Sequence, residues 1–230
     1  MSTTPEIFRD TDGNPEIILY NAKAMDILRL YPDNHFNLAV IDPPYNLERF
    51  RNGIGENDRF TTKADAGFNN NPPDEEFFNE LFRVSKNQII WGANNFVLPT
   101  SEYFLIWNKM QTVPNFASAE YAYVSMGLKI PAKVFDYSIH KHNQTTKIHP
   151  TQKPIPLYDF IFKTYAKPGN KILDCFLGSG AIMHALDKAN KQDGMNLTFT
   201  GVEMNETYFN DAIDWYKQDV IQATGTINFL

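Results

Sequence analysis

One strand–helix–strand unit near the end of the chain constrains the fold more than any other feature. Residues 171–174 read as a buried strand, residues 175–180 as a glycine-rich turn and residues 181–189 as a helix, and a second strand over residues 197–203 ends in Glu203. Parallel strands need a crossover connection of this kind, which is usually a helix. Ligands of such a sheet bind outside the carboxyl ends of its strands. The sequence therefore predicts an α/β fold with a ligand site at the glycine-rich turn.

The residues of this turn indicate which ligand it binds. Gly178 and Gly180 let the backbone approach a ligand closely, and Glu203 can accept hydrogen bonds from both hydroxyls of a ribose. Met183 stands where a dinucleotide site has Gly or Ala, and the Gly-Lys-Ser/Thr of a P-loop is absent. Asp174 adds a negative charge, which favours a cationic ligand over a phosphate. S-adenosylmethionine, a sulfonium compound, fits these features, with expected contacts from Asp174, Phe176, Gly178, Ser179, Gly180, Glu203 and Met204.

A second short apolar run, residues 38–41, ends in a stiff polar corner. Asp42, Pro43, Pro44 and Tyr45 follow it, and the prolines have nearly fixed φ and no N–H group. The corner presents a carboxylate, a free carbonyl and an aromatic face. Asp42 and the Pro43 carbonyl could accept the hydrogens of an exocyclic amino group while Tyr45 stacks on its ring. Taken alone, a turn with a helix-capping Asp explains these residues equally well.

The remaining elements follow from apolar spacing and from helix start signals. Two segments, 109–117 and 129–147, are expected to be irregular. Further strands are expected over residues 16–20, 88–91, 103–107 and 120–125, and helices over 21–30, 75–85 after a capping Asp74, 157–165 and about 206–218.

Three motifs resemble the DNA amino-methyltransferases. Asp-Pro-Pro-Tyr at 42–45 resembles their Asp/Asn/Ser-Pro-Pro-Tyr/Phe/Trp signature, and the Asp form resembles the adenine-N6 branch. His-Pro-Thr-Gln-Lys-Pro at 149–154 is nearly the same as the element before the cofactor half of permuted members. Residues 174–181 resemble their Asp-Pro-Phe-x-Gly-Ser-Gly-Thr, with Cys for Pro and Ala for Thr. Tyr-Asn-Ala at 20–22 departs from the usual Gly-Asp-Ala.

The order of these motifs, with the Asp42 corner first and the glycine turn last, resembles the permuted class called beta. The resemblance implies a doubly wound, Rossmann-like methyltransferase sheet with circularly permuted motif order and inserted target-recognition loops. It implies a single domain over 1–230, with a mobile flap and target-recognition segments within 46–148 and the cofactor-binding half at 149–219. Thr151 and Lys153 precede a helix, where the carboxylate of a bound amino acid is favoured. The remaining cofactor contacts implied are Asn21, Ala22, Asp42 and His149.

Charge and composition limit the partners. The formal charge of −6 argues mildly against nucleic acid, but residues 131–153 are locally basic. Candidate DNA contacts are Arg49, Arg51, Lys133 and Lys141. The single cysteine, Cys175, excludes an internal disulfide and a cysteine-based zinc cluster, and His149 has no second His or acidic residue at metal-ligand spacing. With no signal peptide and no membrane-length apolar run, the expected compartment is the cytoplasm.

The expected activity is site-specific methylation of double-stranded DNA in a restriction-modification system. A methyl group passes from S-adenosylmethionine to N6 of an adenine flipped out of the duplex. Alternatives are cytosine-N4 methylation by the same chemistry, methylation of RNA or of a protein glutamine, and an inactive cofactor-binding subunit that only recognises DNA. A homodimer is left open.

Overall fold

The computed structural model describes residues 4–9, 13, 15–45, 71–114, 116–143, 145, 147–149 and 151–221. The strands are β1 (Glu6–Arg9), β2 (Pro15–Asn21), β3 (Leu38–Ile41), β4 (Gln88–Trp91), β5 (Phe104–Asn108), β6 (Ala119–Val124), β7 (Lys133–Asp136), β8 (Lys171–Asp174) and β9 (Thr198–Glu203). The α-helices are α1 (Ala24–Leu28), α3 (Glu75–Val84), α4 (Ile139–Asn143), α5 (Ile155–Tyr165), α6 (Ala181–Asp193) and α7 (Glu206–Tyr216). Two short 3-10 helices, η2 (Ala93–Asn95) and η3 (Met126–Leu128), and a π-helical segment after α7, η4 (Lys217–Ile221), complete the described elements.

All described strands form one nine-stranded sheet in the order β1-β2-β9-β8-β3-β4-β6-β5-β7. Strands β2, β9, β8, β3 and β4 are mutually parallel. Strand β6 is antiparallel to both β4 and β5, and β7 runs parallel to β5. From β8 the chain continues to β9, towards the β1 edge of the sheet, whereas from β3 it continues to β4, towards the β7 edge. The neighbouring strands β8 and β3 therefore form the switch point at which ligands of open sheets bind.

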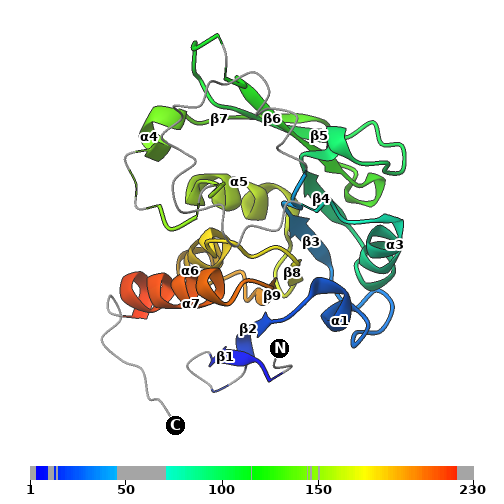
Figure 1. Ribbon diagram of the computed structural model, residues 1–230, viewed down its shortest axis with the longest axis vertical. Helices are drawn as coiled ribbons and strands as arrows, with labels where there is room; N and C mark the ends of the chain where they lie inside the picture. The colour runs from blue at the N-terminus through cyan, green and yellow to red at the C-terminus, as the bar shows by residue number, and fades with distance from the viewer. Residues whose placement is uncertain are drawn as a thin grey trace.

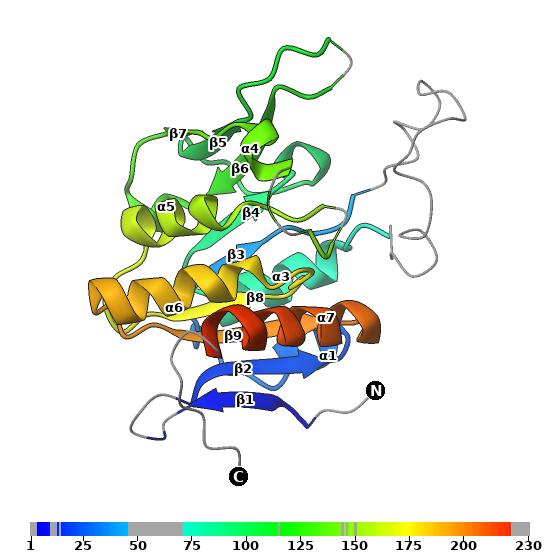
Figure 2. The same ribbon diagram turned by 90° about the vertical axis from the view of Figure 1, so that its left-hand side faces the viewer.

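Helices cover both faces of this sheet. Figure 1 shows α5, α6 and α7 on one side of the sheet and α1 and α3 on the other. Figure 2 looks onto the first of these sides, with α5, α6 and α7 in front of the strands. Side chains alternate along each strand. In the fully buried strand β3, Leu38 and Val40 join the core shared with α5, α6 and α7, whereas Ala39 and Ile41 join the core shared with α1 and α3. The fold is the doubly wound α/β sheet that the sequence predicts.

Most expected elements are confirmed, and β3, β4 and β8 have the predicted bounds. The Asp74 cap is present, because its carboxylate accepts a hydrogen bond from the Phe77 N–H at 2.9 Å. The helix expected over 21–30 is shorter, since α1 spans only Ala24–Leu28. The expectation that 129–147 is irregular is wrong, because this segment contains β7 and α4. Most of the predicted flap, residues 46–70, lies outside the described residues.

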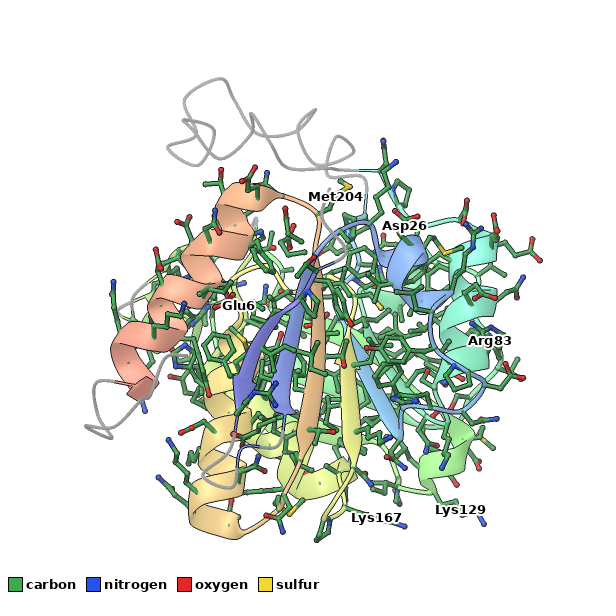
Figure 3. All side chains as sticks on the ribbon, turned by 90° about the horizontal axis from the view of Figure 1, so that it is seen from below. Glu6, Asp26, Arg83, Lys129, Lys167 and Met204 are labelled. Atoms are coloured by element: carbon green, nitrogen blue, oxygen red, sulfur yellow. The ribbon has the colours of Figure 1, made fainter. Side chains whose placement is uncertain are left out.

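The carboxyl ends of β3, β8 and β9 lie at one edge of the sheet. In Figure 3, Met204, which directly follows β9, lies at the upper edge, and Lys167 and Lys129 lie at the opposite edge. Asp42 follows β3 directly, and Asp174 ends the neighbouring strand β8. Parallel pairing of Leu38 with Ile172 and of Ala39 with Leu173 fixes the relative position of these two acids.

Replacement of Leu81 in α3 tests the packing of the helices on the sheet. Its side chain is 0% exposed in the core shared with α1. We expect Leu81→Ala to lower the free energy of unfolding by about 2–5 kcal/mol in urea titrations, because it leaves a cavity. The matched control Leu30→Ala removes the same atoms from a residue that is 62% exposed, and its change should stay within about 0.5 kcal/mol. Equal losses in the two variants would contradict this description of the core.

Candidate active site

The corner after β3 places Asp42, Pro43, Pro44 and Tyr45 along the wall of a cavity of about 610 Å³. The Tyr45 ring lies directly on Gly92, at the end of the neighbouring strand β4. A Cβ atom at Gly92 would meet two ring carbons at 2.9 Å, and Gly92 has φ of +63°. Only glycine suits both conditions. The ring of Tyr45 is thus supported from beneath by backbone.

Asp42 forms the end of a row of four alternating charges, which we call the charge row: Lys109, Glu120, Lys153 and Asp42. The Lys153 Nζ lies 2.5 Å from Asp42 Oδ2 and 3.0 Å from Glu120 Oε2. The Lys109 Nζ lies 2.6 Å from Glu120 Oε1. The Lys153 side chain is only 5% exposed. A buried ammonium of this kind requires close counter-charges, which the two carboxylates supply.

Burial and neighbouring charges set the protonation of this row. Burial raises the pKa of Asp42 by more than the Lys153 ammonium lowers it, and the Glu120 charge raises it further. Burial also opposes ionisation of Glu120, but the ammonium groups of Lys153 and Lys109 lower the pKa of Glu120 to about 2. Although burial alone would lower the pKa of Lys153, the two carboxylates hold it well above its usual value. Lys153 and Glu120 are therefore permanently charged.

The glycine turn after β8 is tied to the end of β9 through Glu203. One Glu203 carboxylate oxygen accepts a hydrogen bond from the Gly178 N–H at 2.9 Å, and the other accepts one from the Asn205 N–H at 2.8 Å. Gly178 has φ of +53°, and a Cβ atom there would meet the His149 ring at 3.5 Å. Burial and Lys153 lower the pKa of His149 to about 4, so this ring is neutral near pH 7. The turn thus presents bare backbone beside a fixed carboxylate.

Asp174 lies beneath the same turn and is 2% exposed. Its Oδ1 accepts a hydrogen bond from the Phe176 N–H at 2.9 Å. Burial raises the pKa of Asp174 to about 8, and the charges of Asp42 and Glu203 act in the same direction. No contact between Asp174 and a cation is seen among the described residues. Asp174 is therefore protonated near pH 7, and a positively charged ligand above the turn would favour its ionisation.

The structure brings most of the other predicted site residues to this cavity. Thr151 donates its N–H to His149 Nδ1 at 3.3 Å. Asn21 uses its side-chain amide within the protein, donating to the carbonyl of Glu203 at 3.0 Å. Lys153 contacts Asp42 and Glu120, a set of partners that differs from the ligand carboxylate expected from the sequence. The predicted residues that line the cavity are Ala22, Asp42, Pro43, Pro44, Tyr45, His149, Thr151, Lys153, Phe176, Gly178, Ser179, Glu203 and Met204.

The predicted DNA contacts lie elsewhere. Lys133 is exposed on β7 and Lys141 is exposed on α4, while Arg49 and Arg51 fall outside the described residues. Gly180 begins α6 with φ of +70°. In the described part of the chain, no group of three or more His, Cys, Asp or Glu side chains is arranged to hold a metal ion. None of the described helices has the length and apolar character needed to cross a membrane.

Sequence reasoning missed several residues of the cavity wall. Lys109 was expected to begin an irregular segment and Glu120 to begin a strand, and no motif marked either residue. Tyr208 of α7 packs edge-on against His149, with ring centroids 4.4 Å apart. Tyr158 of α5 and His142 of α4 also line the cavity. A charged residue beside a strand and an aromatic residue in a helix are both too common to have singled out these positions.

The fold, the glycine turn and the shared cavity together define a Rossmann-like methyltransferase. A family model described as DNA methylase, of the N6 and N4 type, matches residues 64–214 of the chain. The chain therefore belongs to the DNA methylase family of N6 and N4 methyltransferases.

Individual relatives agree with this family. Type II methyltransferase M.BglII of Bacillus subtilis is 24% identical over an alignment 249 residues long, gaps included, and the alignment covers 84% of this chain and 67% of the relative. Type II methyltransferase M2.MboI of Moraxella bovis is 24% identical over 221 residues, which cover 75% of this chain and 79% of the relative.

Solved structures share the fold. The structure of M1.HpyAVI in complex with SAM superposes with a TM-score of 0.52 at 18% identity, covering 86% of this chain and 99% of that one. The cytosine-N4-specific PvuII DNA methyltransferase superposes with a TM-score of 0.54 at 13% identity, covering 86% of this chain and 85% of that one.

Replacement of Asp174 tests its buried, uncharged state. Because its pKa is raised to about 8 on folding, the native state holds a proton that the unfolded chain has lost between about pH 4 and pH 8, and stability must fall as pH rises through this range. We expect Asp174→Asn, which keeps an acceptor for Phe176, to remove this loss. The variant should melt higher than the wild type near pH 8, by about 2–4 °C for each kcal/mol regained, and the difference should shrink towards about pH 4. Melting curves with parallel pH dependence would exclude a protonated Asp174.

Proposed function

We propose that this protein transfers a methyl group from S-adenosylmethionine to the N6 amino group of adenine in double-stranded DNA. The observation that carries the proposal is the position of Asp42. Its carboxylate lines the same cavity as the glycine turn, and only its Oδ2 is engaged by Lys153. Membership of the DNA methylase family supplies DNA as the substrate. The remaining oxygen, Oδ1, is free of that ion pair and can accept an N–H from a base.

The residues around the glycine turn fit the cofactor. The Glu203 carboxylate is held by two backbone N–H groups and keeps lone pairs for two ribose hydroxyls. The backbone at Gly178, which carries no side chain, allows close approach, and the acid Asp174 beneath the turn favours a cation. When bound, S-adenosylmethionine supplies a methyl group that is already activated by the positive sulfur.

The chain contributes alignment and electrostatics. Asp42 Oδ1 and the Pro43 carbonyl accept the two hydrogens of the target amino group, which leaves the nitrogen lone pair available for attack. Tyr45, supported by Gly92, stacks on the base. The amino group is otherwise occupied in base pairing, so the base must leave the duplex. As the methyl group arrives, one amino proton must depart, and the Asp42 carboxylate is the base beside it. Alignment of the two reactants supplies much of the rate.

Cytosine-N4 methylation is the second candidate, because a structure with this specificity shares the fold. The amino group and the chemistry are the same, so the fold alone does not separate the two reactions. The Asp form of the Asp-Pro-Pro-Tyr corner supports adenine. Incubation with labelled S-adenosylmethionine and plasmid DNA, followed by digestion to nucleosides, tests the proposal directly. N6-methyladenine is expected, N4-methylcytosine would establish the alternative, and absence of label in both would overturn both.

We assign target recognition to the segments between the catalytic corner and the cofactor half, within 46–148. Two predicted DNA contacts in this region, Lys133 and Lys141, have exposed side chains. Such lysines bind phosphates and position a duplex, whereas base edges are read by other contacts. The acidic balance of the whole protein then coexists with a basic DNA-facing part.

Removal of the Asp42 carboxylate tests its catalytic role. We expect Asp42→Ala to lower the single-turnover methylation rate by at least about 100-fold, because the target amino group loses an acceptor. The affinity for S-adenosylmethionine, measured by calorimetry, should change little. Asp33→Ala, at an exposed carboxylate paired with Arg83, is the matched control and should retain the wild-type rate. Methylation by Asp42→Ala at the rate of the control would refute the role.

A side chain at Gly178 tests the cofactor loop. Gly178→Val must adopt a positive φ and fill the space beside His149. We expect its Kd for S-adenosylmethionine to rise about tenfold or more, which corresponds to about 1.4 kcal/mol. Gly169→Val, at a glycine with φ of +77° and open space around its Cβ position, carries similar backbone strain away from the cavity and should bind normally. Unchanged affinity in Gly178→Val would remove the loop from the cofactor site.

A further inference from the structure

The proposed function uses only Asp42 from the charge row and leaves the other three residues without a role. We propose that Lys153 and Glu120 are positioning residues for Asp42. Lys153 holds Oδ2 so that Oδ1 is presented to the target amino group, and Glu120, anchored by Lys109, holds Lys153 in place. The inference rests on the proposed function; it gives Lys153 a role other than the one its motif implies, and it gives a role to Glu120 and Lys109, which no motif of the sequence marks.

The surroundings of Lys153 leave its ammonium little freedom. It contacts Asp42 at 2.5 Å and Glu120 at 3.0 Å, and it lies 5.3 Å from the centroid of the Trp91 ring. A cation over an aromatic face is attracted by it. Because the side chain is 5% exposed, water cannot readily replace these partners. An ammonium shared between two carboxylates fixes the direction from which each is approached.

Glu120 is itself rigidly placed. It stands on β6 opposite Trp107 of β5, and its second oxygen binds Lys109 at 2.6 Å. Lys109 lies just beyond β5 and 5.1 Å from the Trp107 ring centroid. The row therefore ties the catalytic corner after β3 to the β5–β6 hairpin on the far side of β4. A contribution limited to local packing would not require the charges to alternate along the whole row.

Other titratable groups near Asp42 also bear on a pH test. Burial raises the pKa of Tyr158 far above the neutral range and also raises that of Tyr45, while burial lowers the pKa of His142. His149 is neutral near pH 7, as described above. Asp174 titrates in the working range, with a pKa of about 8. Asp174 remains in every variant below, so differences between variants report on the charge row.

The row makes predictions of opposite sign for its two inner members. Loss of the Lys153 charge raises the pKa of Asp42, because burial and the Glu120 charge then lose their strongest opponent and the Lys109 charge remains as a weaker one. Loss of the Glu120 charge lowers the pKa of Asp42, because Lys153 then serves Asp42 alone. Damage to packing would not reverse direction between the two variants.

The experiment compares Lys153→Met and Glu120→Gln with the wild type in the full chain. The Asp42 carboxyl carbon is followed by NMR titration, with its signal assigned by its loss in Asp42→Asn. Single-turnover methylation of duplex DNA is followed over the same pH range, and calorimetry gives the Kd for S-adenosylmethionine. Lys188→Met, which removes a lysine paired with Asp159 between α6 and α5, is the matched control and should leave all three readouts unchanged.

For Lys153→Met we expect a higher Asp42 midpoint, a rate lowered about tenfold or more at about pH 7 and partial recovery towards about pH 9. For Glu120→Gln we expect a lower midpoint and a reduced maximal rate, since Asp42 is held differently. The Kd should stay within about twofold of wild type in both variants, well under the tenfold change that 1.4 kcal/mol would produce.

Weakened cofactor binding by Lys153→Met with an unchanged Asp42 midpoint would overturn the inference and return Lys153 to the cofactor carboxylate. Midpoint shifts in the same direction would also overturn it. If Lys153→Met does not fold, Glu120→Gln alone tests the inference: a lower Asp42 midpoint supports it, and an unchanged or higher midpoint overturns it. Opposite midpoint shifts in a protein that methylates no DNA would uphold the charge row and refute the proposed function.

Discussion

Parallel pairing of β3 with β8 is the interaction on which the site depends. These strands are distant in the sequence, yet Leu38 pairs with Ile172 and Ala39 with Leu173 at the centre of the sheet. The pairing sets the Asp42 corner beside the glycine turn, because parallel strands end at the same edge. Closing so long a loop costs conformational entropy, but the cost grows only slowly with length. The site therefore requires that β3 and β8 be neighbours in the sheet, and it can form whichever of the two comes first in the chain.

Local chemistry explains what could be predicted from the sequence. The strands β3, β4 and β8 are short apolar runs with sharp boundaries, and the Asp42 corner and glycine turn carry their signals within a few residues. Strand β7 was not predicted because it lies at the sheet edge and is held there by backbone pairing to β5. Its Val134 is 60% exposed, so the strand lacks the run of buried apolar residues that marks β3, β4 and β8. Glu120 was not predicted as a site residue because its part in the site is its contact with Lys153. These two residues are far apart in the sequence, and no motif spacing links them. The sequence predicted a ligand carboxylate as the partner of Lys153, because this lysine precedes a helix. Position along the chain could not reveal that Asp42 and Glu120 lie beside it in the folded protein.

Three acids lie at the carboxyl ends of β3, β8 and β9. Asp42 and Glu203 line the cavity, Asp174 lies beneath the glycine turn, and burial raises the pKa of all three. Such raised values are typical of functional sites, where the fold tolerates an unfavourable charge arrangement for the sake of a ligand. The two backbone N–H groups at Glu203 and the ammonium at Asp42 relieve part of this, and a cationic ligand would relieve more. These three acids thus disfavour a phosphate beside the glycine turn and favour an onium compound there.

Two aspartates, Asp42 and Asp174, lie at the ends of neighbouring strands but have different hydrogen-bond partners. Asp42 has a buried lysine at 2.5 Å, which opposes its protonation and occupies one oxygen. Asp174 has a backbone N–H at 2.9 Å and no such cation among the described residues, so its pKa reaches about 8. In the proposed reaction Asp42 accepts amino hydrogens, a task that the ammonium of Lys153 assists by opposing protonation of this carboxyl, whereas Asp174 beneath a cation site can ionise when the cation binds. Under the proposed function, the difference between the two roles therefore comes from Lys153, which contacts Asp42 and has no counterpart at Asp174 among the described residues.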